Sequence, residues 1–336
     1  MRFLYPAAIA VMALMALVSH AAAQSRPSAS TQLEQTYPNK PIRLLVPFAP
    51  GGSIDIAARI LGAPLGQALG QNIVIDNRPG SGGLIAMQET ARANLDGYTM
   101  ILATGAQMGI APALYARPGY DPVKNFAHVI HLTDTPLILI VHPQLPVANA
   151  REFIAFTQVP ANRGKVNAAS TSNGTYTHLT IELFKSQTGA ELTHIPYKGA
   201  TPAINDLLGR QVQSMFTTTA SAQSYIAGGR VRALGVTSAK RSPAMPDVPT
   251  FTEQSIAGLT VSSWNGVLMP AGTPAPVVAR VAAECGKALQ LAEVRSRLAT
   301  LGAEIAGVSG EPFTRMVRED VARWAGVVKA AGVKVE

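Results

Sequence analysis

The sequence predicts an α/β protein of two lobes, and three observations support this. The chain has 336 residues, whereas single hydrophobic cores stop growing at about 250–300 residues. Apolar residues make up 47% of it and charged residues 14%, which excludes a highly charged disordered chain and a coiled coil. Short apolar runs alternate with helical stretches, a pattern typical of mixed, mainly parallel sheets flanked by helices. We expect strands in the runs 42–48, 73–75, 98–103, 137–141, 212–216 and 231–236.

Two helices are predicted from apolar residues that recur at helical spacing. The first covers 54–69, and Gly70 directly after it is a typical C-terminal stop. Ser53 precedes this helix and is its expected N-cap. The second helix covers 313–328 near the end of the chain. Both are expected to pack one apolar face against a sheet.

The first residues have the pattern of an export signal. A positive start at Arg2, an apolar run over 3–18 and an Ala-x-Ala site ending at Ala23 predict a cleaved signal peptide over 1–23. The alternative is an uncleaved membrane anchor, but a membrane span needs about 20 apolar residues. Residues 24–36 are polar and aperiodic, and we expect them to form a leader between the cleavage site and the folded body.

Loop-rich segments suggest how the two lobes are connected. The clusters at 134–136 and 262–263 bracket the middle third of the chain, which indicates that one lobe is inserted into the other. We expect lobe 1 to comprise 37–140 and 262–336, and lobe 2 to comprise 141–261.

Motifs for the common catalytic chemistries are missing from the sequence. It contains no Gly-x-Ser-x-Gly elbow, His-Glu-x-x-His helix, phosphate-binding Gly-Lys-Ser/Thr loop or Cys/His zinc spacing. Cys285 is the only cysteine and lies among apolar residues at helical spacing, so we expect a buried thiol and no disulfide. His128 and His131 precede Asp134 and imitate a metal spacing, but they continue into an apolar run, which favours ordinary strand histidines. We therefore expect no enzyme activity, no cofactor and no metal.

Glycine-rich turns follow several predicted strands. Residues 46–55 pass through Gly51 and Gly52 directly into a helix N-terminus, where bare N–H groups attract anions. The turn at 80–83 is either a ligand-facing loop or a plain turn, since Ile85 stands where a dinucleotide motif needs a small residue. Further polar turns occur at 104–107, 170–175 and 217–219. Because ligands bind at strand ends in open α/β sheets, we expect these turns to converge on one ligand.

The chain resembles the Bug-type receptors, which are periplasmic solute-binding proteins of tripartite tricarboxylate transporters. The resemblance covers almost the whole mature sequence. It rests on VPFAPGGS at 46–53, NRPGSGG at 77–83, DGYT at 96–99, PYKGATPA at 196–203, PDVPT at 246–250 and SWNG at 263–266. It implies a two-lobe Venus flytrap in the periplasm that captures a small organic acid, mono- or dicarboxylate, and delivers it to membrane permease subunits.

The resemblance also implies which residues bind the ligand. A first loop and a second loop act as pincers on a carboxylate, and further turns line the walls. Carried onto this chain, the first pincer comprises Phe48, Gly51, Gly52, Ser53 and Asp55, the second comprises Ser172, Asn173, Gly174 and Thr175, and the walls comprise Ala106, Gln107, Tyr197 and Thr217.

Three of these assignments have alternatives. Asp55 either contacts bound water or ligand, or stabilises the helix start. Tyr197 either faces the cleft or belongs to a packing turn. Thr217 stands where the family often has an acidic residue, so an anionic or neutral distal group suits this chain better.

Alternatives also exist for the function as a whole. The protein is either a transport receptor, a ligand-sensing partner of a membrane sensor, or an exported α/β enzyme. We expect a monomer. We also expect no binding of nucleic acid, because the net charge of +8 is spread thinly along the chain.

Overall fold

The computed structural model describes residues 37–242 and 245–333. The predicted signal peptide and polar leader, 1–36, lie outside the described residues. The chain divides into two compact units at Asn39 and Lys40. Only residues 37–39 of the first unit are described, so the following account concerns the second unit, from Lys40 onward.

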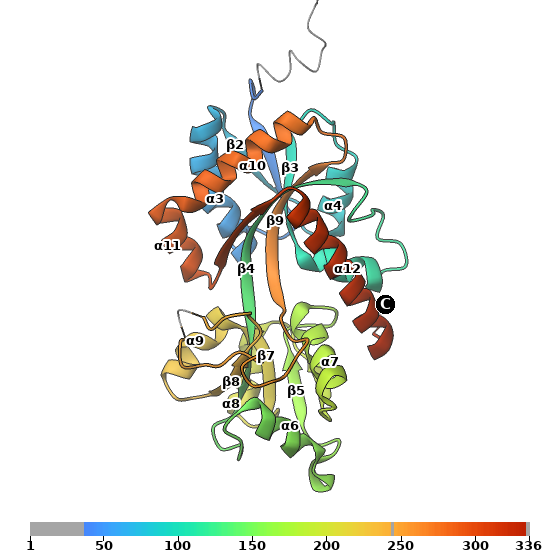
Figure 1. The fold of residues 1–336 in the computed structure, drawn as a ribbon, viewed down its shortest axis with the longest axis vertical. Coiled ribbons are helices and arrows are strands. Elements are labelled where there is room, and N and C mark those ends of the chain that lie inside the picture. The colour runs from blue at the N-terminus through green and yellow to red at the C-terminus, as the bar shows by residue number, and fades with distance from the viewer. Residues whose placement is uncertain (1–36, 243–244, 334–336) are drawn as a thin grey trace, which may run out of the picture. The chain divides into compact units, whose positions relative to one another are not determined.

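The first sheet combines a parallel edge with an antiparallel centre (Figure 1). Strands β2 (Ile73–Asn77), β1 (Ile42–Val46) and β3 (Thr99–Thr104) run parallel. Strand β9 (Ser262–Pro270) lies antiparallel to β3 on one side and to β4 (Phe126–Val141) on the other. Strand β10 (Glu304–Ser309) also pairs with β4. The carboxyl ends of β1 and β3 therefore open at the same edge of this sheet.

The second sheet is built on the continuation of β4. Its last residues, from Leu137 to Val141, pair antiparallel with β7 (Ser214–Thr218), and β8 (Arg232–Val236) pairs with the same segment. Strands β5 (Asn167–Ser170) and β6 (Thr193–Pro196) extend the sheet parallel to β7. Both sheets thus share β4, which runs through the centre of Figure 1.

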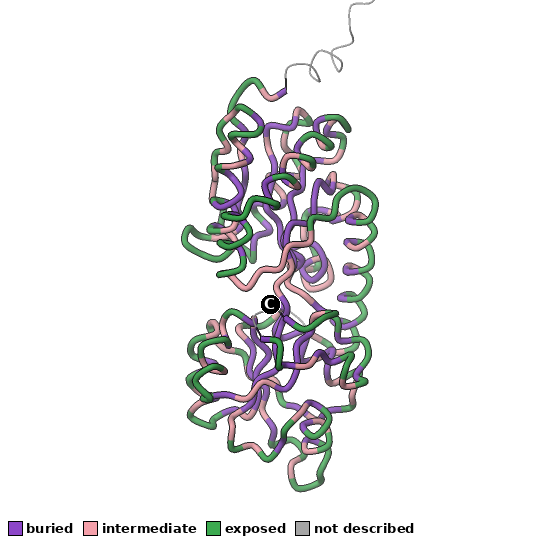
Figure 2. Tube along the Cα trace, turned by 60° about the vertical axis from the view of Figure 1, so that its left-hand side comes forward, coloured by how far each residue is buried: buried purple, intermediate pink, exposed green. Residues whose placement is uncertain are grey.

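Helices flank both sheets, as the α/β prediction requires. They are α3 (Ser53–Leu69), α4 (Leu84–Ala91), α5 (Ala111–Leu114), α6 (Ala150–Gln158), α7 (Tyr176–Thr188), α8 (Ala200–Leu208), α9 (Thr219–Ala227), α10 (Ala275–Gln290), α11 (Ala292–Thr300) and α12 (Glu311–Ala331). In Figure 2 the buried residues are concentrated on the strands, whereas the helices alternate buried and exposed positions. This alternation is the 3.6-residue pattern of an amphipathic helix on a core.

Separate apolar clusters support the two sheets. Leu45, Ile101 and Phe313 belong to a cluster on the first sheet. Phe153 and Phe184 belong to a cluster on the second sheet, where Trp324 of α12 also packs. Helix α12 begins on the first core and ends on the second, so it bridges the two alongside β4 and β9.

The junction between the sheets is held by backbone pairing around Thr237. Pro136 of β4 is opposite Ser262 of β9 in the first sheet, and the next residue, Leu137, is opposite Thr218 in the second. Thr237 accepts a hydrogen bond from the Leu137 amide through its hydroxyl at 2.8 Å and donates its own amide to the Leu137 carbonyl at 2.9 Å. The pairing at Pro136 and Leu137 does not test the predicted lobe limits, 140/141 and 261/262, which stay a prediction.

Most element predictions are confirmed. Every run predicted as a strand overlaps one, helix α3 starts one residue before its predicted span, and Gly70 ends it in the left-handed conformation. Cys285 is buried in α10, and burial raises the pKa of its thiol to about 12. The predicted N-cap is wrong, because Gly52 occupies that position and no side chain caps the helix.

We expect Gly105→Ala to destabilise the fold. A Cβ on Gly105 would collide with the Tyr176 hydroxyl and the Trp264 indole, both buried where α7, β9 and η2 (Ala106–Ile110) meet. Overpacking of this kind costs about 1–3 kcal/mol of the free energy of unfolding. Urea denaturation measures it. Gly286→Ala is the matched control, because its Cβ meets nothing within 4 Å and alanine favours a helix interior.

Candidate functional site

A cavity of about 980 Å³ lies at the carboxyl ends of β1, β3, β5 and β7. It is lined by Phe48, Ala49, Pro50, Gly52, Ser53, Ile54, Gly82, Thr104, Ala106, Gln107, Ile110, Ala111, Leu114, Tyr115, Leu137, Thr171, Ser172, Asn173, Gly174, Thr175, Tyr176, Thr177, Thr217, Thr218, Ser221 and Ser263. Among the described residues, no Asp, Glu, Lys, Arg or His lines it. Polar contacts in this cavity therefore come from amides, hydroxyls and backbone groups.

The first wall is the loop between β1 and α3, and Asp55 holds it in shape. The buried Asp55 carboxylate accepts the Gly51 amide at 2.9 Å and the Asn77 amide group at 3.0 Å, and it pairs with Arg59 at 3.0 Å. Asn77 also donates to the Phe48 carbonyl at 2.9 Å. Hydrogen bonding from Arg59 is the main reason that the pKa of Asp55 falls to about 2. Asp55 is thus ionised at neutral pH and fixes the loop from behind.

The same loop leaves the start of α3 available to an anion. Gly52 is the N-cap and offers no side chain to the first-turn amides, so these N–H groups have no partner within the helix. Gly52 and Ser53 are exposed and line the cavity, and Ile54 lines it as well. Together with the helix dipole, these donors form a site for one negatively charged group.

The opposite wall is the loop between β5 and α7. The Thr175 hydroxyl donates to the Ser172 carbonyl at 2.8 Å, and the Thr171 amide donates to the Thr177 hydroxyl at 3.0 Å. The Gly174 amide donates to Nδ1 of His178 at 3.1 Å. Ser172 and Asn173 remain exposed at the tip. The loop is therefore rigid through its own hydrogen bonds and presents its tip to the cavity.

Two stacked histidines support this second loop from below. The rings of His178 and His194 lie 3.7 Å apart at an interplanar angle of 8°. Because the Ser170 hydroxyl donates to the Ser172 carbonyl at 3.1 Å, it must accept from Nε2 of His194, 2.6 Å away. Likewise, Nδ1 of His178 must be unprotonated to accept from Gly174. Burial lowers the pKa of both rings, that of His194 to about 4, so both are neutral at pH 7.

The remaining walls come from β3, β7 and the turn before α4. Oε1 of Gln107 accepts both the amide and the hydroxyl of Thr104, at 2.9 and 2.6 Å, and its Nε2 donates to the Gly82 carbonyl at 2.9 Å. Gln107 thus fastens the 80–83 turn to the end of β3. Thr217 is 1% exposed, and its hydroxyl has no hydrogen-bond partner among the described residues.

The cavity brings together most of the residues that the sequence predicted for the site. Those that line it are Phe48, Gly52, Ser53, Ala106, Gln107, Ser172, Asn173, Gly174, Thr175 and Thr217. Gly51 and Asp55 are not among the lining residues, and the Gly51 amide donates to the Asp55 carboxylate at 2.9 Å. Tyr197 lies outside the lining and donates its hydroxyl to Asp206 at 2.7 Å, as a packing turn would.

Sequence reasoning missed Arg59 and the two histidines as supports of the loops. Arg59 stands one helical turn after Asp55, so an i,i+4 pair is a signal that identifies it. The stacking of His178 on His194 has no such signal, because it depends on α7 packing against β6.

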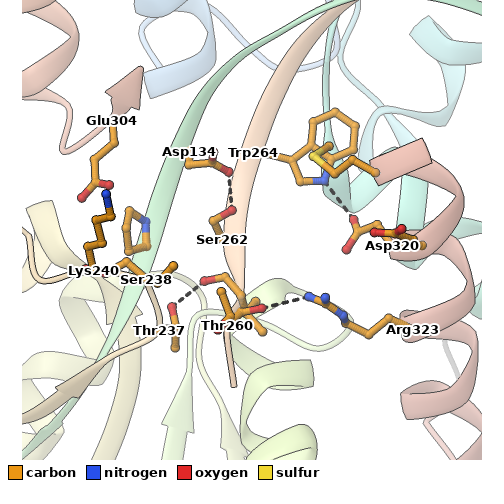
Figure 3. Close-up of a pocket in the computed structure, with 15 residues that line it drawn as sticks. Asp134, Thr237, Ser238, Lys240, Thr260, Ser262, Trp264, Glu304, Asp320 and Arg323 are labelled. Atoms are coloured by element: carbon orange, nitrogen blue, oxygen red, sulfur yellow. Dashed lines mark hydrogen bonds between the residues drawn. The ribbon is translucent and has the colours of Figure 1, made fainter. Parts of the chain in front are cut away.

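A smaller cavity of about 340 Å³ lies beside β4 and β9, near the point where β4 passes from one sheet to the other (Figure 3). It contains Asp134 and Glu304, and burial together with the Asp134 charge raises the pKa of Glu304. Four carboxyl groups and two cations line it, namely Asp134, Glu304, Glu319 and Asp320 with Lys240 and Arg323. Asp320 accepts from the Trp264 indole at 2.9 Å, and Arg323 donates to the Thr260 carbonyl at 2.9 Å. Because carboxyl groups outnumber cations here, an acid is less favoured than in the larger, uncharged cavity, which is the candidate site.

Within residues 37–242 and 245–333, no group of three or more His, Cys, Asp or Glu side chains is placed to hold a metal ion, and His128 and His131 lie on β4. No helix there combines the length and apolar character required to cross a bilayer.

We expect Asp55→Ala to loosen the first loop. The substitution removes the charged acceptor that the Gly51 amide and the Asn77 amide group share, and a hydrogen bond to a charged group contributes about 1.5–3 kcal/mol. Hydrogen exchange over 48–54 should speed up and the free energy of unfolding should fall. Asp247→Ala, at an exposed turn, is the control that should change neither. An unchanged exchange rate in Asp55→Ala would show that the loop holds its shape without the carboxylate.

We expect stability to fall as the pH drops from about 6.5 towards 4. An unfolded histidine takes up a proton near pH 6.5, whereas the lowered pKa values of His178 and His194 keep the folded rings neutral. Acid therefore favours the unfolded state, and the stabilisation is fully present only above pH 6.5. Urea titrations across this range measure the slope. His194→Gln, which does not titrate, should flatten it, whereas His142→Gln in a partly exposed turn should leave it unchanged.

Comparison with known proteins agrees with this geometry. Residues 57–333 match the model of the tripartite tricarboxylate transporter family receptor. BugT of Bordetella pertussis is 35% identical over 90% of this chain and 92% of its own. The solved structure of the periplasmic binding protein BugD is 36% identical, covers 89% of this chain and 100% of its own, and has a TM-score of 0.71. MatC from Rhodopseudomonas palustris, solved with bound malate, is 33% identical, covers 87% and 100%, and has a TM-score of 0.69. This chain therefore belongs to the tripartite tricarboxylate transporter receptor family and has its two-lobe α/β periplasmic-binding-protein fold.

Proposed function

We propose that this protein is a periplasmic receptor that captures a small organic carboxylate between its two lobes and delivers it to a tripartite tricarboxylate-type permease. The observation that carries the proposal is the pair of donor loops, at Gly52–Ser53 and Ser172–Asn173, on opposite walls of one uncharged cavity. The malate bound by MatC supports a carboxylate ligand. Binding without turnover agrees with a cavity whose described lining has no charged side chain.

The energetics require both loops. Each charge-assisted hydrogen bond contributes about 1.5–3 kcal/mol, so three such bonds contribute roughly 5–9 kcal/mol. This is comparable to the several kcal/mol lost when the carboxylate is desolvated. Net affinity must then come from lobe closure and from burial of the carbon skeleton. Donors on two lobes couple closure to the ligand, because only the closed state makes both sets of bonds.

The location and partners follow from the same proposal. The signal-peptide pattern over 1–23 supports a periplasmic location for the mature protein, with residues 24–36 as the expected leader after the cleavage site. We expect the receptor to be a monomer, and its expected partners are membrane permease subunits. Co-purification with permease subunits supports transport, whereas capture by a membrane sensor kinase would support the sensing alternative.

Calorimetry with a panel of organic acids tests the proposal. We expect at least one acid to bind with micromolar affinity, which corresponds to about 8 kcal/mol, and to be recovered unchanged after long incubation. Gly52→Val blocks the start of α3 and Asn173→Ala removes a free amide group at the opposite tip, so each should weaken binding at least tenfold. Asn205→Ala, exposed on α8, is the control. Wild-type affinity in both loop variants would move the site elsewhere.

A further inference from the structure

The three long helices that start at the cavity differ in how their N-termini are capped. Helix α7 is capped by Thr175, whose hydroxyl accepts the His178 amide. Helix α9 is capped by Thr218, whose hydroxyl accepts the Ser221 amide at 3.3 Å. Helix α3 alone of these three has no side-chain cap, since Gly52 holds that position. The first-turn amides of α3 are therefore free for a ligand, whereas those of α7 and α9 are partly engaged by their N-caps.

The far end of the cavity, at β7 and α9, is polar but carries no charge. Its lining residues are Thr217, Thr218 and Ser221. The buried Thr217 hydroxyl has no partner among the described residues, so a ligand group that donates or accepts one hydrogen bond satisfies it. A second carboxylate at this end would find no cation in the described lining and would lose its hydration, which is costly for an unpaired buried charge.

The space between these ends is apolar. Ile54 and Ile110 line it together with Leu114, Tyr115 and Leu137, and Ile110 and Leu137 are each 1% exposed. Such a wall favours a ligand with a hydrocarbon or aromatic body, because its burial removes apolar surface from water.

We propose that this receptor selects monocarboxylates with an apolar body and a neutral or hydroxylated far end, and discriminates against dicarboxylates of the same skeleton. The inference rests on the proposed function and narrows its ligand class. The uncapped start of α3 takes the carboxylate together with the opposite loop at Ser172–Asn173, the apolar wall takes the skeleton, and Thr217 takes a neutral polar group.

Matched ligand pairs test the selectivity by calorimetry. Benzoate and terephthalate differ only in a second carboxylate at the far side of the ring, and hexanoate and adipate differ in the same way. We expect the monocarboxylate of the preferred pair to bind at least tenfold more tightly than its dicarboxylate, and 4-hydroxybenzoate to bind at least as tightly as benzoate. Terephthalate or adipate binding equally or better would overturn the inference while leaving the proposed function intact. No binding by any acid in these pairs or in the broad panel would overturn both.

A charge introduced at the far end provides an independent check. Ser221 is half-buried and lines the cavity at the first turn of α9. Ser221→Lys places a cation there and should shift the preference towards terephthalate at least tenfold relative to wild type. Ser221→Met has a similar length without the charge and should leave the ratio unchanged. An equal shift in both variants would mean that size rather than charge sets the selectivity, which contradicts the inference.

Discussion

The structure depends on one strand that belongs to two sheets. At about 3.3 Å per residue, the sixteen residues of β4 extend through both cores, and the partners of β4 change between Pro136 and Leu137. Proline has no amide hydrogen to donate, so the ladder has a natural interruption where the first sheet ends. Ser262 stands opposite Pro136 at the first residue of β9. A relative movement of the two lobes must therefore be absorbed near this pair of residues.

Both cavity loops are held by hydrogen bonds to residues that do not line the cavity. Asp55 and Asn77 hold the first loop, and His178 and the Ser170–His194 pair hold the second. These supports lie outside the cavity lining, whose described side chains are uncharged. Rigid loops lose little conformational freedom on binding, which preserves affinity. The charged groups behind the loops therefore contribute to the cavity through the shape that they impose.

Local sequence signals were sufficient for the fold class and for most of the cavity. The span of α3 was predictable because its apolar residues recur at helical spacing and Gly70 ends it. The extent of β4 was not, because His128, His131 and Asp134 interrupt its apolar pattern, although β9 pairs with it from Phe126 to Pro136. The N-cap was misassigned to Ser53, since a serine before a helix is usually the cap. Only the backbone conformation shows that Gly52 takes that place.

The residues behind the loops are the hardest part to predict, because their roles depend on contacts between distant segments. Asp55 was correctly considered as a group that stabilises the helix start, but its partner Asn77 comes from the end of β2. The ion pair between Asp55 and Arg59 decides which electrostatic potential the first loop presents to the cavity. By neutralising each other behind the loop, Asp55 and Arg59 leave the amides and dipole of α3 as the attraction that an anion meets at the surface. An uncapped helix start with this ion pair behind it therefore presents positive potential without presenting a cation. On the proposed function, this start attracts one carboxylate, and the rest of the ligand meets uncharged walls.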